Sequence, residues 1–68
     1  MSVARVTEII ASSQDSFEDA TRKGLKRAGK TLKNVRGAWV EGQKVECDSH
    51  GHVKEFRVIL KVTFILED

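Results

Sequence analysis

The clearest pattern of apolar and polar positions lies close to the carboxyl end of the chain. Between Phe56 and Leu66 every second residue is apolar. Strict alternation over this length is typical of a β-strand that packs one face against a core. The other positions are mostly polar, yet Ile59 and Ile65 place large apolar side chains among them. We therefore expect this second face to contact another subunit or a ligand.

A helical repeat precedes the strand pattern. Apolar or small side chains recur at intervals of three or four residues from position 17 to position 32. Acidic side chains gather in the first half of this segment and basic ones in the second, as the helix dipole favours. Ser12, followed three residues later by Asp15, resembles a capping box, and Ser13 is an alternative cap. The pattern predicts a helix from Ser13 to Leu32.

Two further strands complete the pattern. The segment from Val3 to Ile10 is rich in β-branched residues, which predicts a first strand. Turn-forming residues from Asp48 to His52 separate the last strand from a middle one, which we place at Val35–Cys47. The order β-α-β-β predicts an α+β fold, in which a three-stranded antiparallel sheet packs on one helix. The length of 68 residues fits a single domain, 1–68.

The middle strand carries the only tryptophan of the chain. If Ala38 and Val40 face the helix, alternation directs Trp39 to the uncovered face of the sheet. There Trp39 either packs against another subunit or stacks on a flat ligand such as a flavin or adenine ring. Gly37, on the same face, either lets a flat group approach the backbone or allows a bend. Gly42 is a candidate bulge, because the apolar positions change phase after it.

The small size of the chain limits its core. A single cysteine, Cys47, forms no internal disulfide, and no Cys/His spacing matches a zinc site. His50 and His52 flank Gly51 in the predicted turn, where we expect solvated histidines rather than metal ligands. Oligomerisation is therefore the expected source of additional stability.

Charge and hydropathy argue against several classes of partner. Twelve basic and ten acidic residues give a net charge of +2, and no aromatic residues are interleaved with the basic half of the helix. We therefore expect a solvated helix face and no nucleic-acid partner. No apolar run approaches a membrane span, and no segment resembles a signal peptide. One unpaired cysteine suits a reducing compartment, so we expect a cytoplasmic protein.

The sequence contains no recognisable catalytic constellation. It has no nucleophile–base pair, no paired carboxylates at an identifiable site, no glycine-rich phosphate loop and no metal triad. The serines near the predicted start of the helix have a sufficient role in capping it. We therefore expect a protein that is not an enzyme.

Four segments, in this order and spacing, are similar to a known family. They are Ile-Ile-Ala-Ser-Ser at 9–13, Ser-Phe-Glu-Asp-Ala at 16–20, Arg-Ala-Gly-Lys-Thr-Leu-Lys-Asn-Val at 27–35, and Val-Lys-Glu-Phe-Arg-Val-Ile-Leu-Lys-Val-Thr-Phe-Ile-Leu-Glu at 53–67. Over essentially its whole length the chain resembles the dodecins, small β-α-β-β proteins that assemble as hollow dodecamers and commonly bind flavins. The resemblance implies a homododecamer.

The resemblance also implies candidate ligand residues. In flavin-binding dodecins a tryptophan near the start of the middle strand stacks on the isoalloxazine ring. Ungapped matching places that position on Gly37, while Trp39 lies about 6–7 Å further along the same strand face. Trp39 then either stacks on the ring in a displaced pocket or fills the pocket, and a two-residue gap would make it the family tryptophan itself. The family's glutamine at the polar edge of the flavin corresponds to Arg57, whose guanidinium donates hydrogen bonds but accepts none.

Two further contacts follow from the resemblance and from the acidic residues. Lys44 falls where some dodecins place a basic residue near a nucleotide phosphate, which implies a contact to flavin mononucleotide (FMN) or coenzyme A; an ordinary surface lysine is the alternative. Glu41, Glu46 and Asp48 are candidate ligands for calcium or magnesium at symmetry axes, although solvated carboxylates are the favoured interpretation. We predict no resident metal site.

Taken with the residues, the resemblance implies a protein that stores or sequesters riboflavin or FMN between subunits. The predicted cofactor-binding residues are Trp39, Arg57, Gly37 and Lys44. The alternative is a dodecin-like structural oligomer that has lost flavin binding, and that binds another nucleotide or coenzyme A, a cation, or no ligand.

Overall fold

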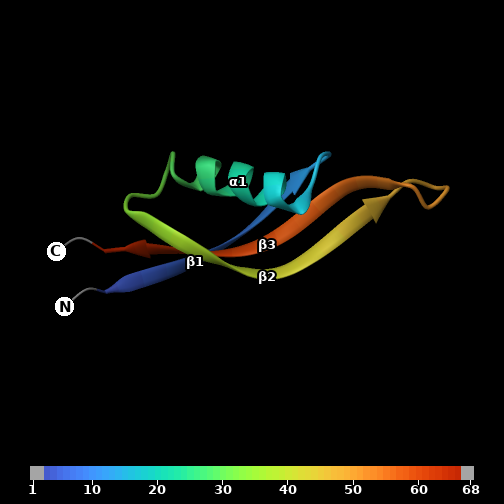
Figure 1. Cartoon of the computed structure of the whole chain (residues 1–68). Helices are drawn as coiled ribbons and strands as arrows, with labels where there is room; N and C mark the ends of the chain where they lie inside the picture. The colour runs from blue at the N-terminus through green and yellow to red at the C-terminus, as the bar shows by residue number, and fades with distance from the viewer. Residues whose placement is uncertain (1–2, 67–68) are drawn as a thin grey trace.

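The computed structural model describes residues 3–66 of the chain. Its elements are strand β1 (Ala4–Ser13), helix α1 (Phe17–Ala28), strand β2 (Val35–Cys47) and strand β3 (Val53–Ile65). The strands form one antiparallel sheet in the order β1-β3-β2, and α1 lies across one face of it (Figure 1). The predicted α+β fold, with one helix on a three-stranded antiparallel sheet, is confirmed.

The central strand β3 sorts the sheet residues onto two faces. Opposite Leu60 lie Ile9 of β1 and Val40 of β2, and opposite Val62 lies Ala38. These residues belong to the face that α1 covers, so the predicted side of Ala38 and Val40 is confirmed. Ala38 packs against the core, whereas Val40 retains 52% of its accessible surface and is not a core residue. The residues between these covered positions in sequence point the other way. We call that second side of the sheet the open face.

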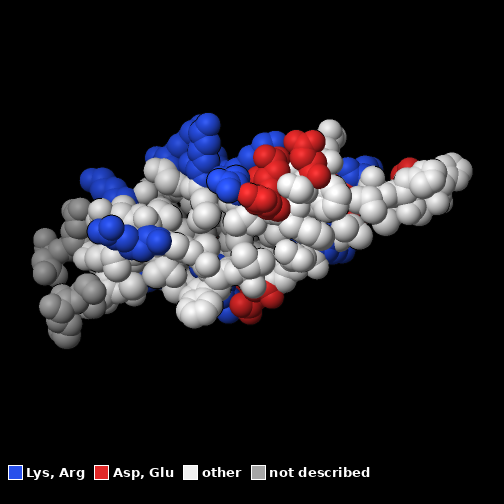
Figure 2. Space-filling view, in the orientation of Figure 1, with Lys and Arg blue, Asp and Glu red and all other residues white. Residues whose placement is uncertain are grey.

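The helix distributes its charges as its dipole favours. Figure 2 shows acidic side chains over the first part of α1 and basic ones over the later part. Arg22 Nη2 lies 2.8 Å from Glu18 Oε1, and Lys23 Nζ lies 2.9 Å from Asp19 Oδ2. Exposed ion pairs at i and i+4 of this kind stabilise a helix modestly. These contacts agree with the expectation of a solvated, helix-supporting face.

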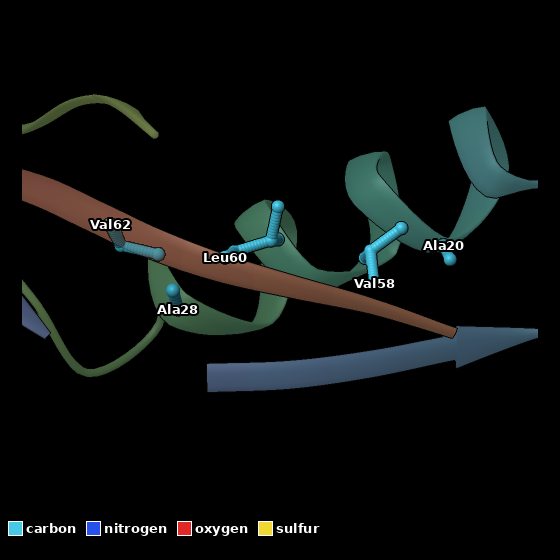
Figure 3. Packing of buried hydrophobic residues seen from close by; sticks show 5 residues of the cluster. All are labelled: Ala20, Ala28, Val58, Leu60 and Val62. Carbon is cyan, nitrogen blue, oxygen red and sulfur yellow. The ribbon is translucent and has the colours of Figure 1, made fainter. Parts of the chain in front are cut away.

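The core lies between α1 and the middle of β3 (Figure 3). Its buried apolar residues are Ala20, Ala28, Val58, Leu60 and Val62. The predicted apolar face of the last strand therefore meets the predicted helix stripe. Small residues bring the two layers close together: a Cβ atom on Gly24 would lie only 2.8 Å from the Cβ of Ala11.

The helix begins later than the predicted start at Ser13. Strand β1 continues through Ser12 to Ser13, which pairs with Phe56 of β3, so neither serine caps the helix and that prediction is wrong. The N-cap is Ser16, whose Oγ accepts a hydrogen bond from the backbone N–H of Asp19 at 2.9 Å. The pairing of β1 with the long strand β3 overrides the local capping signal.

The helix also ends earlier than the predicted end at Leu32. Its last residue is Ala28, its C-cap is Gly29, and turns follow. Leu32 nevertheless packs against the core, and its N–H donates to the carbonyl of Ala28 at 2.9 Å. The helical spacing of apolar residues therefore correctly indicated that Leu32 reaches the core, although the backbone at Leu32 is no longer helical. Asn34, at φ 61°, then turns the chain into β2.

Strand β2 carries register shifts at Val35/Gly37, Val40/Gly42 and Glu46/Cys47. The middle shift confirms the irregularity predicted at Gly42. After it, Val45 pairs with Phe56, whose ring makes an edge-to-face contact with Phe17 of α1. The bulge thus returns an apolar side chain to the covered face.

Candidate ligand surface on the open sheet face

The open face is organised in cross-strand rows in the order β1-β3-β2. The rows are Glu8, Lys61 and Trp39; then Ile10, Ile59 and Gly42; then Ser12, Arg57 and Lys44. The helix lies on the other side of the sheet (Figure 1), so large apolar side chains stay exposed here. Ile10 retains 69% and Trp39 retains 67% of its accessible surface.

Trp39 lies on the open face, as predicted. It borders a shallow depression of about 310 Å³ that is lined by Arg36, Gly37, Ala38, Trp39 and Thr63. A Cβ atom on Gly37 would meet nothing within 4 Å. No side chain therefore fills the space above Gly37, next to Trp39. A flat group has room to lie there against the tryptophan ring.

An apolar shelf adjoins the tryptophan row. Ile10 and Ile59 face each other across β1 and β3, and Gly42 exposes the backbone of β2 next to Ile59. A second depression of about 290 Å³ covers this shelf and reaches Lys44 and Arg57. The apolar shelf thus ends at two cationic side chains. Such a surface suits a ligand that combines a flat or apolar body with a negatively charged group.

Arg57 forms a compact ion network at the charged end of the shelf. Its Nε and Nη2 atoms donate to Glu55 Oε1 at 2.9 and 2.7 Å, and its Nη1 lies 3.2 Å from Glu46 Oε1. Lys44 Nζ also lies 3.2 Å from Glu46 Oε1. The four side chains sum to zero charge, so an arriving anion has to compete with two carboxylates for the same donors.

The ion pairs of this network favour the charged forms of Glu46 and Arg57. The pKa of Glu46 is held below its ordinary value, chiefly by its hydrogen bond with Lys44 and also by the positive charges of Lys44 and Arg57. The pKa of Arg57 is raised, chiefly by its hydrogen bonds to Glu55. Both groups therefore stay ionised at neutral pH.

The predicted cofactor residues occupy one face but do not meet at one point. Trp39 lies opposite Lys61, while Lys44 lies opposite Arg57, four residues earlier along β3. That offset is about 13 Å at the rise of a β-strand. A ligand that contacts both Trp39 and Arg57 within one chain therefore has to be elongated and to cross the Ile10–Ile59 shelf.

The candidate cation ligands are separated in this chain. Glu41 Oε1 pairs with Lys61 Nζ at 3.3 Å, Glu46 belongs to the network of Arg57, and Asp48 accepts hydrogen bonds within the hairpin turn. Within residues 3–66, no three histidine, cysteine, aspartate or glutamate side chains stand close enough together to hold one metal ion.

Sequence reasoning missed Ile10 as a member of this surface, and it missed that Lys61, which alternation already places on this face of the last strand, is the neighbour of Trp39. The alternation of β1 contained the signal for Ile10, because it has the same parity as Val6 and Glu8, opposite to that of the core residues Ile9 and Ala11. Lys61 becomes relevant only through the strand register, which places it beside Trp39.

Among residues 3–66 there is no helix with the length and apolar character that a membrane crossing needs.

Comparisons with known proteins agree on one family. The family model for Dodecin matches residues 3–67. Calcium dodecin from Mycobacterium tuberculosis is 36% identical over 64 residues, which cover 94% of this chain and 89% of that protein. Its crystal structure superposes with a TM-score of 0.82 at 32% identity, covers 96% of this chain and 91% of that one, and is described as having a novel calcium-binding site.

Two further relatives agree with this match. Dodecin from Thermus thermophilus is 33% identical over 67 residues, which cover 97% of this chain and 94% of that protein. The structure of dodecin from Streptomyces davaonensis superposes with a TM-score of 0.92 at 30% identity, covering 98% of this chain and 97% of that one. Because sequence, length and fold agree from end to end, the chain belongs to the dodecin family.

Proposed function

We propose that this protein binds and sequesters a flavin, riboflavin or FMN, stacked on Trp39 between subunits of a homododecamer. The observation that carries the proposal is the exposure of Trp39 on the open face, beside a depression that Gly37 leaves unobstructed. A large aromatic ring that its own core does not use is suited to stack on another flat ring.

The charged end of the shelf favours FMN over riboflavin. Lys44 and Arg57 lie about 13 Å along the strand from the row of Trp39, in the direction that the apolar shelf runs. A phosphate is a better competitor than a neutral hydroxyl for donors already engaged by Glu46 and Glu55, because it brings negative charge and several acceptor oxygens. We therefore expect the phosphate of FMN at Lys44 and Arg57.

A second copy of the chain supplies the other side of the ligand. A single open sheet face contacts a flat ring from one side only, whereas binding sites usually bury most of the ligand surface. The apolar residues Ile10 and Ile59 beside Trp39 are exposed in one chain and would gain from burial between subunits. The dodecin name of the relatives agrees with such an assembly.

The alternative function is a dodecin-like structural oligomer without flavin, with coenzyme A, another nucleotide or a cation as its ligand. The intramolecular engagement of Arg57 by Glu55 and Glu46 favours it, because a guanidinium held by two carboxylates is not free to meet a ring edge. The name of the calcium dodecin relative points to cation binding in at least one member of the family.

Flavin fluorescence separates the two functions. Riboflavin and FMN are titrated into the purified protein, and the native mass is measured by light scattering. Quenching at micromolar protein, stronger for FMN, together with an oligomeric mass, is the expected result. An oligomer that quenches neither flavin would leave the structural alternative, and a monomer would contradict both.

Catalysis has no support on the open face. Its three cations, Lys44, Arg57 and Lys61, already pair with glutamates. The one serine in its described rows, Ser12, lies opposite the cation Arg57 and not opposite a base. Cys47, the one cysteine of the sequence, is exposed. A free surface thiol suits the reducing cytoplasm that we propose as the location.

A further inference from the structure

The turn between β2 and β3 is tightly built. Asp48 N–H donates to the carbonyl of His52 at 2.9 Å, and Gly51 N–H donates to the carbonyl of Asp48 at 3.1 Å. Gly51 has φ 81°, the left-handed conformation that short hairpin loops assign to glycine. The backbone of the turn is thus fixed, and with it the positions of the two histidines.

Asp48 is fixed by this backbone as well. Its Oδ1 accepts hydrogen bonds from the N–H groups of His50 at 2.8 Å and His52 at 3.0 Å. Its second oxygen, Oδ2, lies 3.5 Å from Nδ1 of His52. A carboxylate held in this way lies beside Nδ1 of the imidazole and leaves Nε2 as the ring nitrogen that Asp48 does not engage.

The two imidazoles are close and accessible. Their ring centroids lie 6.3 Å apart at an interplanar angle of 45°. Both residues are exposed, and the His52 side chain retains 80% of its accessible surface. Zinc and similar ions bind imidazole nitrogens at about 2.0–2.1 Å, so the two ligating nitrogens of one site lie at most about 4 Å apart. The two exposed rings have to turn toward each other from their present centroid separation of 6.3 Å to reach one ion.

We propose that the hairpin tip is a two-histidine site for a divalent transition-metal ion such as Ni²⁺ or Zn²⁺. His50 and His52 are the ligands, and Asp48 is a positioning residue that orients His52. Water fills the remaining coordination positions, because no cluster of three ligating side chains exists in the described part of the chain. Imidazole ligands suit these ions, whereas calcium prefers oxygen ligands. The site is therefore chemically distinct from a calcium site.

The site is also independent of the proposed flavin surface. The turn lies at the far end of the β2–β3 hairpin, beyond α1 (Figure 1). None of its residues lines either depression of the open face. Loss of metal binding and loss of flavin binding can therefore be measured separately in the same preparation.

Calorimetric titration of Ni²⁺ into the untagged full-length protein tests the site. We expect one ion per chain, reversal by a chelator, and no displacement by excess Ca²⁺. His50→Gln and His52→Gln should each weaken binding at least tenfold. Asp48→Asn keeps an oxygen for the turn but loses the carboxylate, so we expect a weakening of about tenfold. Ser49→Ala, in the same turn, is the matched control and should bind like the wild type.

Two results would overturn the two-histidine site. Equal Ni²⁺ affinity in the wild type and in the double variant His50→Gln/His52→Gln would overturn it, as would the absence of binding heat at millimolar Ni²⁺. Circular dichroism confirms that each variant keeps its fold. A flavin titration of the double variant should match that of the wild type, which shows that the two sites do not depend on each other.

Discussion

Trp39 of β2 lies directly opposite Lys61 of β3, on the sheet face that the helix leaves uncovered. Lys61 is held by Glu41, whose Oε1 lies 3.3 Å from its Nζ. This row divides the open face. The depression beside Gly37 lies on one side of it, and the apolar shelf of Ile10 and Ile59 lies on the other.

The position of Trp39 predicts that it serves the ligand more than the fold. Trp39→Ala should weaken FMN binding by about 1–3 kcal/mol, or roughly five- to 150-fold, because the ring loses its stacking partner. The free energy of unfolding should change little, because the side chain is 67% exposed in the single chain. Flavin fluorescence measures the first effect and urea denaturation the second.

Trp39→Phe is the matched control, because it retains an aromatic face at the same position. It should bind FMN more tightly than Trp39→Ala. If instead Trp39→Ala dissociates the oligomer in light scattering, the tryptophan is an interface residue and the structural alternative gains support.

The sequence located Trp39 on the correct face because parity in a strand is a local property. The relationship between Trp39 and Arg57 was not local. It depends on the register between β2 and β3, which includes the bulge at Gly42. Of the two carboxylates that hold Arg57, Glu46 was equally hidden because it lies on the neighbouring strand, whereas Glu55 precedes Arg57 by two residues on the same strand and shares its face by parity.

Arg57 predicts the choice between flavins. Arg57→Gln introduces an amide that both donates and accepts hydrogen bonds. We expect riboflavin affinity to rise by about two- to tenfold, the value of one hydrogen bond, and the preference for FMN to fall because a cation is lost. Parallel riboflavin and FMN titrations provide both values.

Lys44→Ala, in the same titrations, separates recognition of the FMN phosphate from recognition of the flavin ring. It should weaken FMN binding and leave riboflavin binding unchanged, because riboflavin has no phosphate for Lys44 to meet. Equal losses for the two flavins would show that Lys44 does not contact the phosphate.

Gly24 predicts a stability effect that has no connection with the ligand. In Gly24→Ala the new Cβ would lie 2.8 Å from the Cβ of Ala11 and 3.0 Å from Cδ1 of Leu60. Overpacking of this kind costs about 1–3 kcal/mol. Replacing glycine by alanine in a helix gains about 1 kcal/mol in helix propensity. Because the Cβ of Ala11 is a rigid neighbour, we expect the cost to be the larger of the two. We expect a lower urea midpoint.

Gly29→Ala is the matched control for Gly24→Ala. Gly29 has φ −64°, and a Cβ atom there would lie 3.5 and 3.6 Å from backbone oxygens of the preceding turn, so it fits without strain. Its urea midpoint should stay the same or rise slightly. A drop equal to that of Gly24→Ala would show that the helix end, and not the contact with Ala11, limits stability.

The helix start shows why the fold was predictable and its boundaries were not. Hydrophobic spacing identified Ala20, Gly24 and Ala28 as core positions. It did not reveal that Ser12 and Ser13 would pair with Arg57 and Phe56 across the sheet. Strand pairing is a tertiary interaction, so a local serine signal placed the cap too early.

Ser16 predicts a specific capping contribution. Ser16→Ala removes the oxygen that accepts from the N–H of Asp19 at 2.9 Å, and it should lower the free energy of unfolding by about 1 kcal/mol. Ser12→Ala is the control, because Ser12 is an exposed strand residue; its effect should stay within about 0.5 kcal/mol. Chemical denaturation of both variants would contradict this assignment if Ser12→Ala proved the more damaging.

Asp19 predicts how stability responds to acid. Its pKa lies below the ordinary value of 3.8, chiefly because Ser13 donates a hydrogen bond to its carboxylate, with Lys23 contributing a further hydrogen bond and its charge. The unfolded chain therefore binds this proton more readily than the folded one. The resulting stability is fully present above the ordinary value and is lost as the pH falls through the lower folded value.

Asp19→Asn should flatten the acid side of the stability profile measured by urea denaturation between about pH 6 and pH 2. Ser13→Ala should raise the pKa of Asp19 toward its ordinary value, because it removes the largest cause of the shift while Lys23 remains. NMR titration of the Asp19 carboxyl follows this change directly. An unchanged pKa in Ser13→Ala would assign the shift to Lys23 instead, and Lys23→Gln would then raise the pKa of Asp19 where Ser13→Ala had not.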